Sequence, residues 1–600
     1  MKSINEIKLN QLTKNRTYFA SPDSWEDQVL YFLMTDRFSD GKEKKENLFN
    51  RAQDFENAMN NPKRKEKWFF HSDKWNGGTL KGIKSKLNYL KELGITAIWI
   101  SPVFKQVAFE PTYHGYGIQN FLEIDPNFGS REDLQELTRE AHKNGMYILL
   151  DIILNHAGNV FAYTDTDRIY QNICYPVKGF RNHKGEAVLP TENIDFSTIG
   201  PDDGVYPTEL MHHDTFTRKG RIINWDNYPE YIEGDFLLLK NINLGQGDYT
   251  NFQPSEALRI LCQCYKYWIA CADIDGFRLD TVKHLEPGAT RFFVNEIHEF
   301  AYTLGKNNFY ILGEITGGLN FAVDTLKKTG LDAALGINQI SDKLEETAKG
   351  YADPTEFFKL FKNSELLGED EYRWYKDNIV TMFDDHDMVS QQAIKSRFCG
   401  DTNTGKLLLN ALFLNLMTPG IPCIYYGSEQ CFDGSGNIDN MVREAMFACN
   451  FGAFRSQGKH FFDTDHFVYR ELKKIIALRK NNITLTQGRI FVRELSNDGK
   501  RFYIPAKNNE ERFQGVIAWS RVFSSDEIVL LINCSIETAQ TVYVTIDAHL
   551  NSTTDVFEII YSSDENDLLA ACSVYKHDKR KSIKVTVPQH GSIALRRRTA

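Results

Sequence analysis

The sequence has no apolar run long enough to cross a membrane, although apolar residues make up 42% of its 600 residues. A transmembrane helix needs roughly 20 consecutive apolar residues, and residues 1–20 also lack the hydrophobic core of a signal peptide. The sequence therefore predicts no membrane contact, and a cytoplasmic location is the simplest expectation.

Metal-binding cysteine pairs and a basic surface are absent as well. Ten cysteines occur without the close pairing that is typical of zinc sites. Three of them, Cys262, Cys264 and Cys271, fall in one helical pattern, where we expect buried thiols. The formal net charge is −10 and the basic residues are dispersed, which disfavours nucleic acid as a partner and suits an uncharged ligand.

Eight short apolar runs are present instead, and segments with helical periodicity separate them, such as 80–93, 131–144 and 255–271. A strand followed by a helix, repeated, indicates parallel strands joined by crossover helices. Eight such units predict an α/β fold, the (β/α)8 TIM barrel. The expected strands are 29–34, 97–100, 147–151, 276–280, 309–314, 331–334, 379–387 and 421–426.

Polar residues end these runs, at the edge where a TIM barrel carries its active site. Arg278 and Asp280 are two residues apart on one strand, so both side chains point to the same face. We expect the guanidinium to keep the carboxylate ionised, as a carboxylate nucleophile requires. The other polar residues at strand ends are Asp151, His156, Glu314, His386 and Asp387.

Four of these segments resemble the four signature regions of the α-amylase family of glycoside hydrolases: 151–156, 276–284, 313–314 and 383–387. Segments 35–41, 99–102, 113–116, 212–214 and 425–430 also resemble family segments, particularly those of α-amylases and cyclodextrin glucanotransferases. The resemblance extends from residue 29 to the C-terminus. It implies a TIM barrel with an inserted irregular domain B and a C-terminal antiparallel β-sandwich.

Composition agrees with these domains. Segment 157–253 is rich in Gly, Asn, Asp and Tyr with little helical periodicity, and apolar residues alternate at 542–546 and 583–587, as expected for antiparallel strands. We expect the highly charged segment 42–67 to be a solvated barrel loop. The predicted boundaries are an N-terminal extension at 1–24, the barrel at 25–156 and 254–484, domain B at 157–253 and the sandwich, domain C, at 485–600.

The resemblance also implies roles for individual residues. Asp280 is the expected nucleophile, Glu314 the acid/base and Asp387 the carboxylate that grips and distorts the sugar, as in a retaining glycosidase. The apolar strand before Glu314 should raise its pKa. The expected substrate-binding residues are Tyr116, His156, Arg278, Lys283, His284, His386 and Asp151. Of these, Lys283 and His284 contact glucose units downstream of the cut in relatives and favour α-1,4-glucan polymers.

Calcium is an open alternative by the same resemblance. The family pattern Leu-Ala-Asp-Leu-Asn reads Leu239-Lys240-Asn241-Ile242-Asn243 here, so an anionic ligand is missing and Lys240 is expected to supply positive charge. Asn155, Asn241 and the carbonyl of His284 remain as candidate ligands. A second candidate loop contains Asp36 and Asp40.

Three departures from the family bear on the reaction. Asp385 stands where relatives carry asparagine, and Gly117 replaces a tryptophan, which should open the pocket wall. Leu237, next to Phe236, occupies the position of the central aromatic residue of cyclodextrin-forming enzymes. We expect no counterpart of their additional starch-binding domains.

The sequence therefore predicts a retaining hydrolase of internal α-1,4-glucosidic bonds in starch, glycogen or maltodextrins. A 4-α-glucanotransferase or cyclodextrin glucanotransferase stays open as the close alternative. A non-catalytic carbohydrate-binding scaffold is the remote one.

Overall fold

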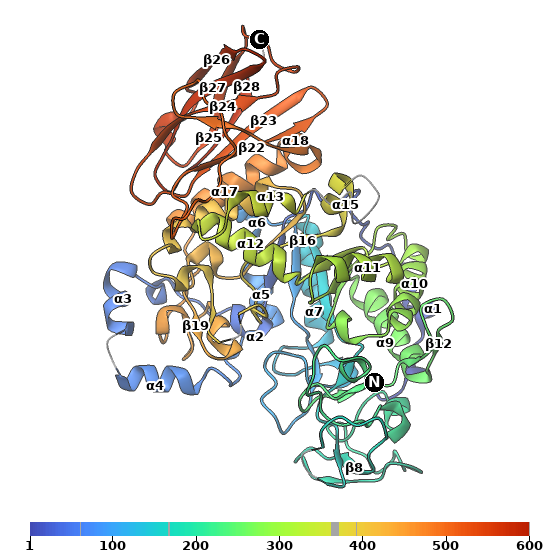
Figure 1. Ribbon diagram of the computed structural model, residues 1–600. Helices are drawn as coiled ribbons and strands as arrows, with labels where there is room; N and C mark the ends of the chain where they lie inside the picture. Colours follow the sequence, from blue (N-terminus) through green and yellow to red (C-terminus); the bar gives the residue numbers. More distant parts are fainter. Residues whose placement is uncertain (60–61, 166–167, 362–370, 392, 599–600) are drawn as a thin grey trace.

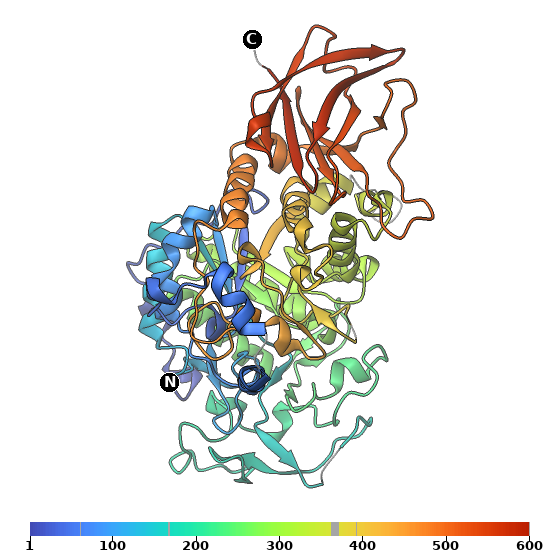
Figure 2. The ribbon, with the colours of Figure 1, turned by 90° about the vertical axis from the view of Figure 1, so that its left-hand side faces the viewer.

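The structure is a computed structural model that describes residues 1–600 except 60–61, 166–167, 362–370, 392 and 599–600. A central barrel lies between a C-terminal β-sheet and an irregular excursion of the chain (Figure 1), and the view turned by 90° shows the same three levels (Figure 2). In the described part of the chain, no helix is long and apolar enough to cross a membrane.

The eight predicted strands form one parallel sheet, in the order β15-β14-β13-β5-β2-β1-β18-β16. A parallel bridge between Ala334 and Ile379 joins its two ends, so the barrel closes and the predicted fold is confirmed. The strands are β1 (Leu30–Leu33), β2 (Ala97–Ile100), β5 (Tyr147–Ile152), β13 (Gly276–Leu279), β14 (Tyr310–Glu314), β15 (Ala333–Leu335), β16 (Val380–Thr381) and β18 (Ile421–Tyr425).

Helices connect these strands and cover the barrel. Ser130 begins α7 in a capping box with Asp133, and Ser255 caps α9. The helix predicted over 80–93 is broken at Lys86, directly after Ser85, whose hydroxyl bonds back to the Gly82 carbonyl at 2.7 Å. The barrel helices are α5 (Leu80–Ser85), α6 (Leu87–Leu93), α7 (Arg131–Lys143), α9 (Glu256–Ala272), α10 (Pro287–Thr303), α11 (Leu319–Thr329), α12 (Asn338–Lys349), α16 (Leu408–Met417) and α17 (Phe467–Lys480).

Loops at the carboxyl ends of the strands are long and carry short elements of their own. Between β5 and α9, over residues 153–255, the chain leaves the barrel and forms the irregular excursion. Pairing of β10 with β6 places Asn241 opposite His156. The excursion therefore returns beside the end of β5. Its elements are β6 (His156–Ala157), β7 (Phe161–Tyr163), β8 (Val177–Arg181), β9 (Ala187–Leu189), α8 (Glu230–Glu233), β10 (Lys240–Asn241), β11 (Gly245–Gln246) and β12 (Gln253–Pro254), and a hairpin of β3 (Phe104–Gln106) and β4 (Ile118–Ile124) precedes it.

Segment 42–67 is not a solvated loop as predicted from its charge. It contains α3 (Arg51–Met59) and the beginning of α4 (Pro62–Phe70). Trp68 is buried against Met441 and Phe451, so α4 packs on the loop after β18. In the sequence, Trp68 follows many charged residues, so the buried apolar contact of α4 could not be recognised there.

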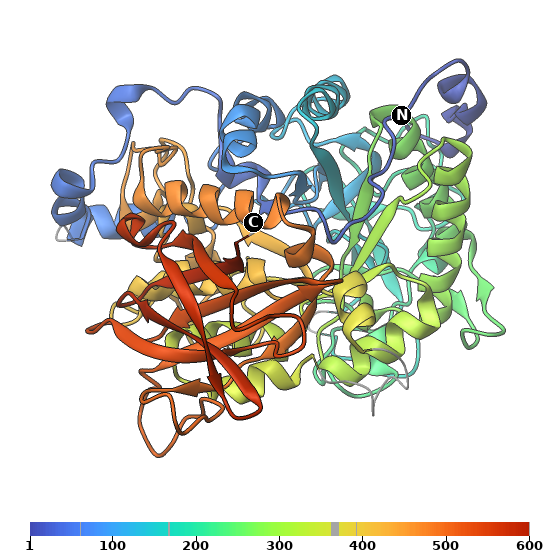
Figure 3. The same ribbon diagram turned by 90° about the horizontal axis from the view of Figure 1, so that it is seen from above.

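The C-terminal sheet is antiparallel, as predicted, and residues 516–521 and 527–533 are buried on both of its faces. Val544 pairs with Ile583, and both belong to an apolar core inside this domain. On the other face, Trp519 donates to the Met417 carbonyl of α16 at 3.2 Å. Seen from above, the sheet covers one side of the barrel (Figure 3). Its strands are β20 (Arg489–Val492), β21 (Leu495–Ser496), β22 (Val516–Phe523), β23 (Asp526–Asn533), β24 (Gln540–Ile546), β25 (Val556–Ser562), β26 (Ala571–His577), β27 (Arg580–Val587) and β28 (Ser592–Arg597).

The thiols of Cys262, Cys264 and Cys271 are buried in α9, as expected. Several short elements lie outside the barrel and the C-terminal sheet. The remaining helices and strands are α1 (Leu9–Thr13), α2 (Thr35–Phe38), α13 (Pro354–Lys359), α15 (Glu371–Asn378), α18 (Ile483–Gln487), β17 (Lys395–Ser396) and β19 (Ser435–Gly436).

Candidate active site

The guanidinium of Arg278 lies among three carboxylates at the ends of neighbouring strands. Its Nη1 is 2.5 Å from Asp280 Oδ1 and 3.0 Å from Asp151 Oδ1. Its Nη2 is 3.0 Å from Glu314 Oε2. Parallel pairing of β13 with β5 and β14 creates this arrangement, because it places Arg278 beside both strands. One buried cation thus holds three predicted site residues together.

Asp151, predicted to bind substrate, has partners within the protein for both of its carboxylate oxygens. Its side chain is fully buried, and its Oδ2 accepts hydrogen bonds from Trp99 Nε1 and from the Tyr116 hydroxyl, each at 3.1 Å. Its other oxygen contacts Arg278. Because both oxygens have partners, Asp151 orients Arg278 and Tyr116.

Burial dominates the electrostatics of Asp280 and Glu314. It raises the pKa of both carboxyl groups to about 7, and Arg278 opposes the rise. The sequence analysis expected a raised pKa for Glu314, and this shift agrees with it. The expectation that Arg278 keeps Asp280 strongly ionised is too simple, because one guanidinium is shared by three carboxylates. Because the three carboxyl groups lie this close together, their pKa values belong to the cluster and not to single residues.

Asp387 has a different environment. Burial works against its charge, but His386 and Arg443 offset this and hold the pKa of Asp387 well below its usual range. His386 Nε2 is 3.1 Å from Asp387 Oδ2, and Arg443 Nη2 is 2.5 Å from Oδ1. The Asp387 side chain is 30% exposed, against 6% for Asp280. It is therefore an ionised acceptor at the open side of the cluster.

Arg443 is a site residue that the sequence analysis missed. Besides Asp387, it binds the backbone carbonyl of His386 through Nε at 2.8 Å. It follows a short 3-10 helix, Asp439–Val442, in the loop after β18. Since it does not end a strand, the strand-end pattern contained no signal for it. Only folding brings this loop to Asp387.

Two neutral histidines line the cluster. Burial lowers the pKa of His156 and His386 to about 3. Within the described structure, His156 Nε2 and His386 Nδ1 are buried without a hydrogen-bond partner. Tyr116 places its hydroxyl 2.9 Å from His386 Nε2. Such unpartnered ring nitrogens suit hydroxyl groups of a ligand.

Lys283 and His284 follow Asp280 on the side that faces the excursion. Lys283 Nζ is 2.6 Å from Asp226 Oδ1, and His284 Nδ1 is 2.7 Å from the Tyr231 carbonyl. Trp225 lies against the His284 ring at 5.6 Å. The structure thus gives both residues contacts to the excursion beside the cluster.

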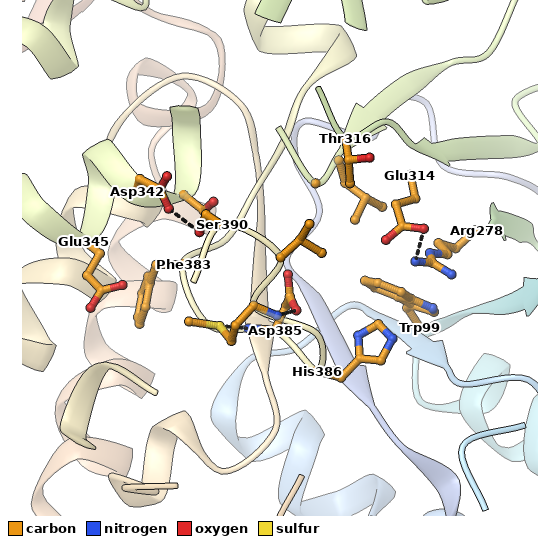
Figure 4. A pocket seen from close by; sticks show the side chains of 15 residues that line it. Trp99, Arg278, Glu314, Thr316, Asp342, Glu345, Phe383, Asp385, His386 and Ser390 are labelled. Carbon is orange, nitrogen blue, oxygen red and sulfur yellow. Dashed lines mark hydrogen bonds and ion pairs between the residues drawn. The ribbon is translucent and has the colours of Figure 1, made fainter. Parts of the chain in front are cut away.

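A cavity of about 20 Å³ separates Glu314 from Asp385 (Figure 4). Asp385 Oδ1 accepts hydrogen bonds from the backbone N–H groups of Asp387, at 2.5 Å, and Met388, at 2.8 Å. Asp385 therefore holds the turn that carries Asp387. Burial, followed by repulsion from Asp387, raises the pKa of Asp385.

We predict that Asp385→Asn moves the basic limb of the pH profile to lower pH. The change removes a negative charge beside the cluster, so loss of the proton from Glu314 becomes easier, while the amide oxygen still accepts both backbone bonds. The pH dependence of kcat/KM measures this. Asp342→Asn is the matched control, because Asp342 lines the same cavity but bonds to Ser390. A profile that is unchanged in Asp385→Asn would contradict the prediction.

The candidate calcium ligands Asn155, Asn241 and His284 do converge, but their donor set is a poor fit for the ion. The Asn155 side chain donates Nδ2–H to the His284 carbonyl at 2.8 Å, and Asn241 donates to the Ile232 carbonyl at 3.1 Å. A hard dication requires oxygen ligands, carboxylates above all. Among the described residues, no group of three His, Cys, Asp or Glu side chains is placed to hold a metal.

Asp235, whose Oδ1 accepts from the Asn241 backbone N–H at 3.0 Å, already has partners. Its Oδ2 is 3.3 Å from Lys240 Nζ and accepts from the Tyr163 hydroxyl at 2.7 Å. At the second candidate loop, Asp36 accepts from the Asn76 backbone and pairs with Arg37 at 3.0 Å. Asp40 accepts from the Lys42 backbone at 2.9 Å. These carboxylates are bonded within the protein.

We predict that exhaustive chelation leaves most of the activity intact. A bound ion would stabilise only the folded state, so any effect should appear in the melting temperature. Activity and thermal unfolding measured with chelator, with and without added calcium, test this. Complete inactivation that calcium reverses would contradict the prediction.

The structure overturns one expectation about the cleft wall, for Gly117, and leaves the one for Leu237 unchanged. Gly117 does not open the wall, because it is buried and a Cβ there would lie 2.7 Å from Thr112 Cγ2. Phe236 packs against Trp225 at 4.6 Å and His284 at 5.2 Å. Leu237 is 57% exposed.

Comparison with known proteins identifies the family of the chain. The family model "Alpha amylase, catalytic domain" matches residues 32–450. An α-amylase of Streptomyces lividans is 27% identical over 464 residues, which cover 72% of this chain and 49% of that protein. A cyclomaltodextrin glucanotransferase of Klebsiella oxytoca is 26% identical over 506 residues, 79% of this chain and 68% of that protein. The chain thus spans about half the length of the Streptomyces relative.

Solved structures show the same fold. The α-amylase of Geobacillus thermoleovorans in complex with acarbose has a TM-score of 0.65 at 22% identity, covering 96% of this chain and 100% of that one. A cyclomaltodextrin glucanotransferase with a three-domain ABC distribution has a TM-score of 0.67 at 20% identity, with the same coverage. The matching family model and the strand-end carboxylates identify the chain as a member of the α-amylase family of glycoside hydrolases.

Proposed function

We propose that this enzyme cleaves internal α-1,4-glucosidic bonds of starch, glycogen or maltodextrins with retention of configuration. The observation that carries the proposal is that Asp280 and Glu314 share one guanidinium at the ends of adjacent strands. Retaining glycosidases place their two carboxyl groups about 5 Å apart, and a shared cation favours a short separation.

In the proposed first step, ionised Asp280 attacks the anomeric carbon while Glu314 donates its proton to the departing glycosidic oxygen. The bond to that oxygen breaks and an ester to Asp280 forms. In the second step Glu314 takes a proton from water, which attacks the same carbon and releases Asp280. The raised pKa of Glu314, about 7, suits proton donation and uptake near neutral pH, whereas Asp280 must be in its ionised form to attack.

The surrounding residues supply binding and orientation. Ionised Asp387 accepts hydrogen bonds from sugar hydroxyls, and His156 and His386 offer unpartnered nitrogens to the same ring. Arg278 holds the two reacting carboxylates. Lys283 and His284 contact the glucose units beyond the cut. Neither of the two proposed steps involves a metal ion. We therefore propose that calcium, when bound, affects the stability of the fold and not the chemical steps.

Hydrolysis is favoured over glucan transfer by the side chains near His284. Transfer requires the acceptor side to hold a sugar and exclude water. Phe236 packs into an aromatic cluster, and the exposed Leu237 gives no ring for a sugar to stack on. The number of domains does not distinguish a hydrolase from a glucanotransferase, since a cyclomaltodextrin glucanotransferase with three domains shares the fold.

Chromatography of the products from starch and maltodextrins tests the proposal. We expect mainly linear maltooligosaccharides, with transfer products only at high donor concentration. Cyclic glucans as the main early product, or redistribution of chain lengths without new reducing ends, would instead support a glucanotransferase.

A further inference from the structure

A groove outside the proposed catalytic centre lies between α4 and the loop that follows β18. We call it the α4 groove, and its volume is about 680 Å³. Ligand sites in proteins commonly measure about 300–1,000 Å³. The groove is lined by Lys65, Glu66, Trp68, Phe69, Ser435, Met441 and Arg455.

Phe69 presents a large aromatic ring in this groove, with 52% of its surface exposed. The preceding residue, Trp68, fixes the helix. Its Nε1 donates to the Gly452 carbonyl at 2.7 Å, and its ring lies 4.4 Å from that of Phe451. Because α4 is anchored, a ligand that packs on Phe69 has little ordering cost to overcome. Phe69 is therefore an exposed aromatic contact on a fixed helix.

The groove is connected to the catalytic centre by a short segment. Met441, which lines the groove, is two residues before Arg443, and Arg443 Nη2 is 2.5 Å from Asp387 Oδ1. Asp439, in the same segment, pairs with Lys395 at 2.7 Å. Figure 1 shows α4 at the same end of the barrel as the excursion, on the opposite side. The groove and the catalytic centre thus share the loop that follows β18.

The groove chemistry matches a sugar chain. Pyranose rings have apolar faces for an aromatic ring and a rim of hydroxyl groups for polar side chains. Lys65 and Glu66 are exposed, and Ser435 adds a hydroxyl. The pairing of both charge signs here, in a chain with a net charge of −10, does not favour an anionic polymer.

We propose that the α4 groove binds a distal stretch of the same α-glucan chain whose bond is cleaved at Asp280. This inference rests on the proposed function. Occupying the groove and the catalytic centre together makes the second contact intramolecular, which raises the apparent affinity for long chains. Short oligosaccharides cannot reach both places and gain nothing.

Phe69→Ala tests the proposal, and Phe70→Ala is the matched control. Phe70 is the next residue on α4 and is 64% exposed, but it does not line the groove. Removing one stacking ring costs about 0.5–1.5 kcal/mol. We therefore expect KM for amylopectin to rise about fivefold in Phe69→Ala, with unchanged kcat and unchanged kinetics on maltotriose. Phe70→Ala should behave as wild type.

Equal KM values for amylopectin in wild type and Phe69→Ala would overturn the proposal, and so would an equal loss in both variants. Binding measured by affinity electrophoresis in glycogen gels provides a second readout, in a Glu314→Gln background that does not digest the gel. Retardation should weaken with Phe69→Ala only. If the wild-type enzyme failed to cleave amylopectin at all, the proposed function would fail, whereas cleavage that ignores Phe69 would reject only the groove.

Discussion

Asp280→Asn should reduce kcat on starch by about 10⁴-fold or more, with KM changed little. An amide is a far poorer nucleophile than a carboxylate, so the covalent intermediate forms too slowly to detect. The substitution keeps the volume of the side chain, and its oxygen can still accept a hydrogen bond from Arg278. Steady-state kinetics on soluble starch, with thermal unfolding as a check of folding, measures this effect.

Asp226→Asn is a suitable control for that variant. Asp226 is 85% exposed and contacts Lys283, so its loss removes a carboxylate near the site without touching the cluster. Its kcat should stay close to that of wild type. Near-normal turnover by correctly folded Asp280→Asn protein would show that another residue is the nucleophile.

Glu314→Gln should lower kcat on starch by about a hundredfold to ten-thousandfold, the usual contribution of a general acid. The loss should be much smaller on a maltosyl substrate with a good leaving group, such as fluoride, because that group departs without a proton. Release of fluoride and of reducing ends, each measured in wild type and variant, gives the two losses.

The ratio of those losses is the decisive quantity for Glu314. A positional role, through its contacts to Arg278 Nη2 and the Thr281 N–H, would reduce both reactions equally. Equal losses would therefore reject Glu314 as the acid. The same variant should also lose the basic limb of its pH profile on starch.

The barrel could be predicted from the sequence because its strands are buried on both faces and read as apolar runs. β1 and β2, for example, are buried throughout. Asp280 and Glu314 were found for the same reason, since each follows such a run. Where apolar residues are scattered among charges, as around Trp68, periodicity gave no signal and a helical insertion was taken for a loop.

Contacts between loops that are distant in the chain could not be predicted from the sequence. Arg443 and Asp387 meet only because the loops after β18 and β16 lie side by side in the closed barrel. The raised pKa of Asp280 could not be predicted from the sequence either. Local sequence placed one arginine beside one aspartate, whereas the fold adds Asp151 and Glu314 to the same guanidinium and buries them all.

The configuration of the first product tests the central claim most directly. Proton NMR of a maltooligosaccharide digest, recorded before mutarotation, distinguishes the two anomers of the new reducing end. Double displacement through Asp280 predicts that the α-anomer appears first. Initial appearance of the β-anomer would contradict the covalent intermediate and the roles proposed for both carboxylates.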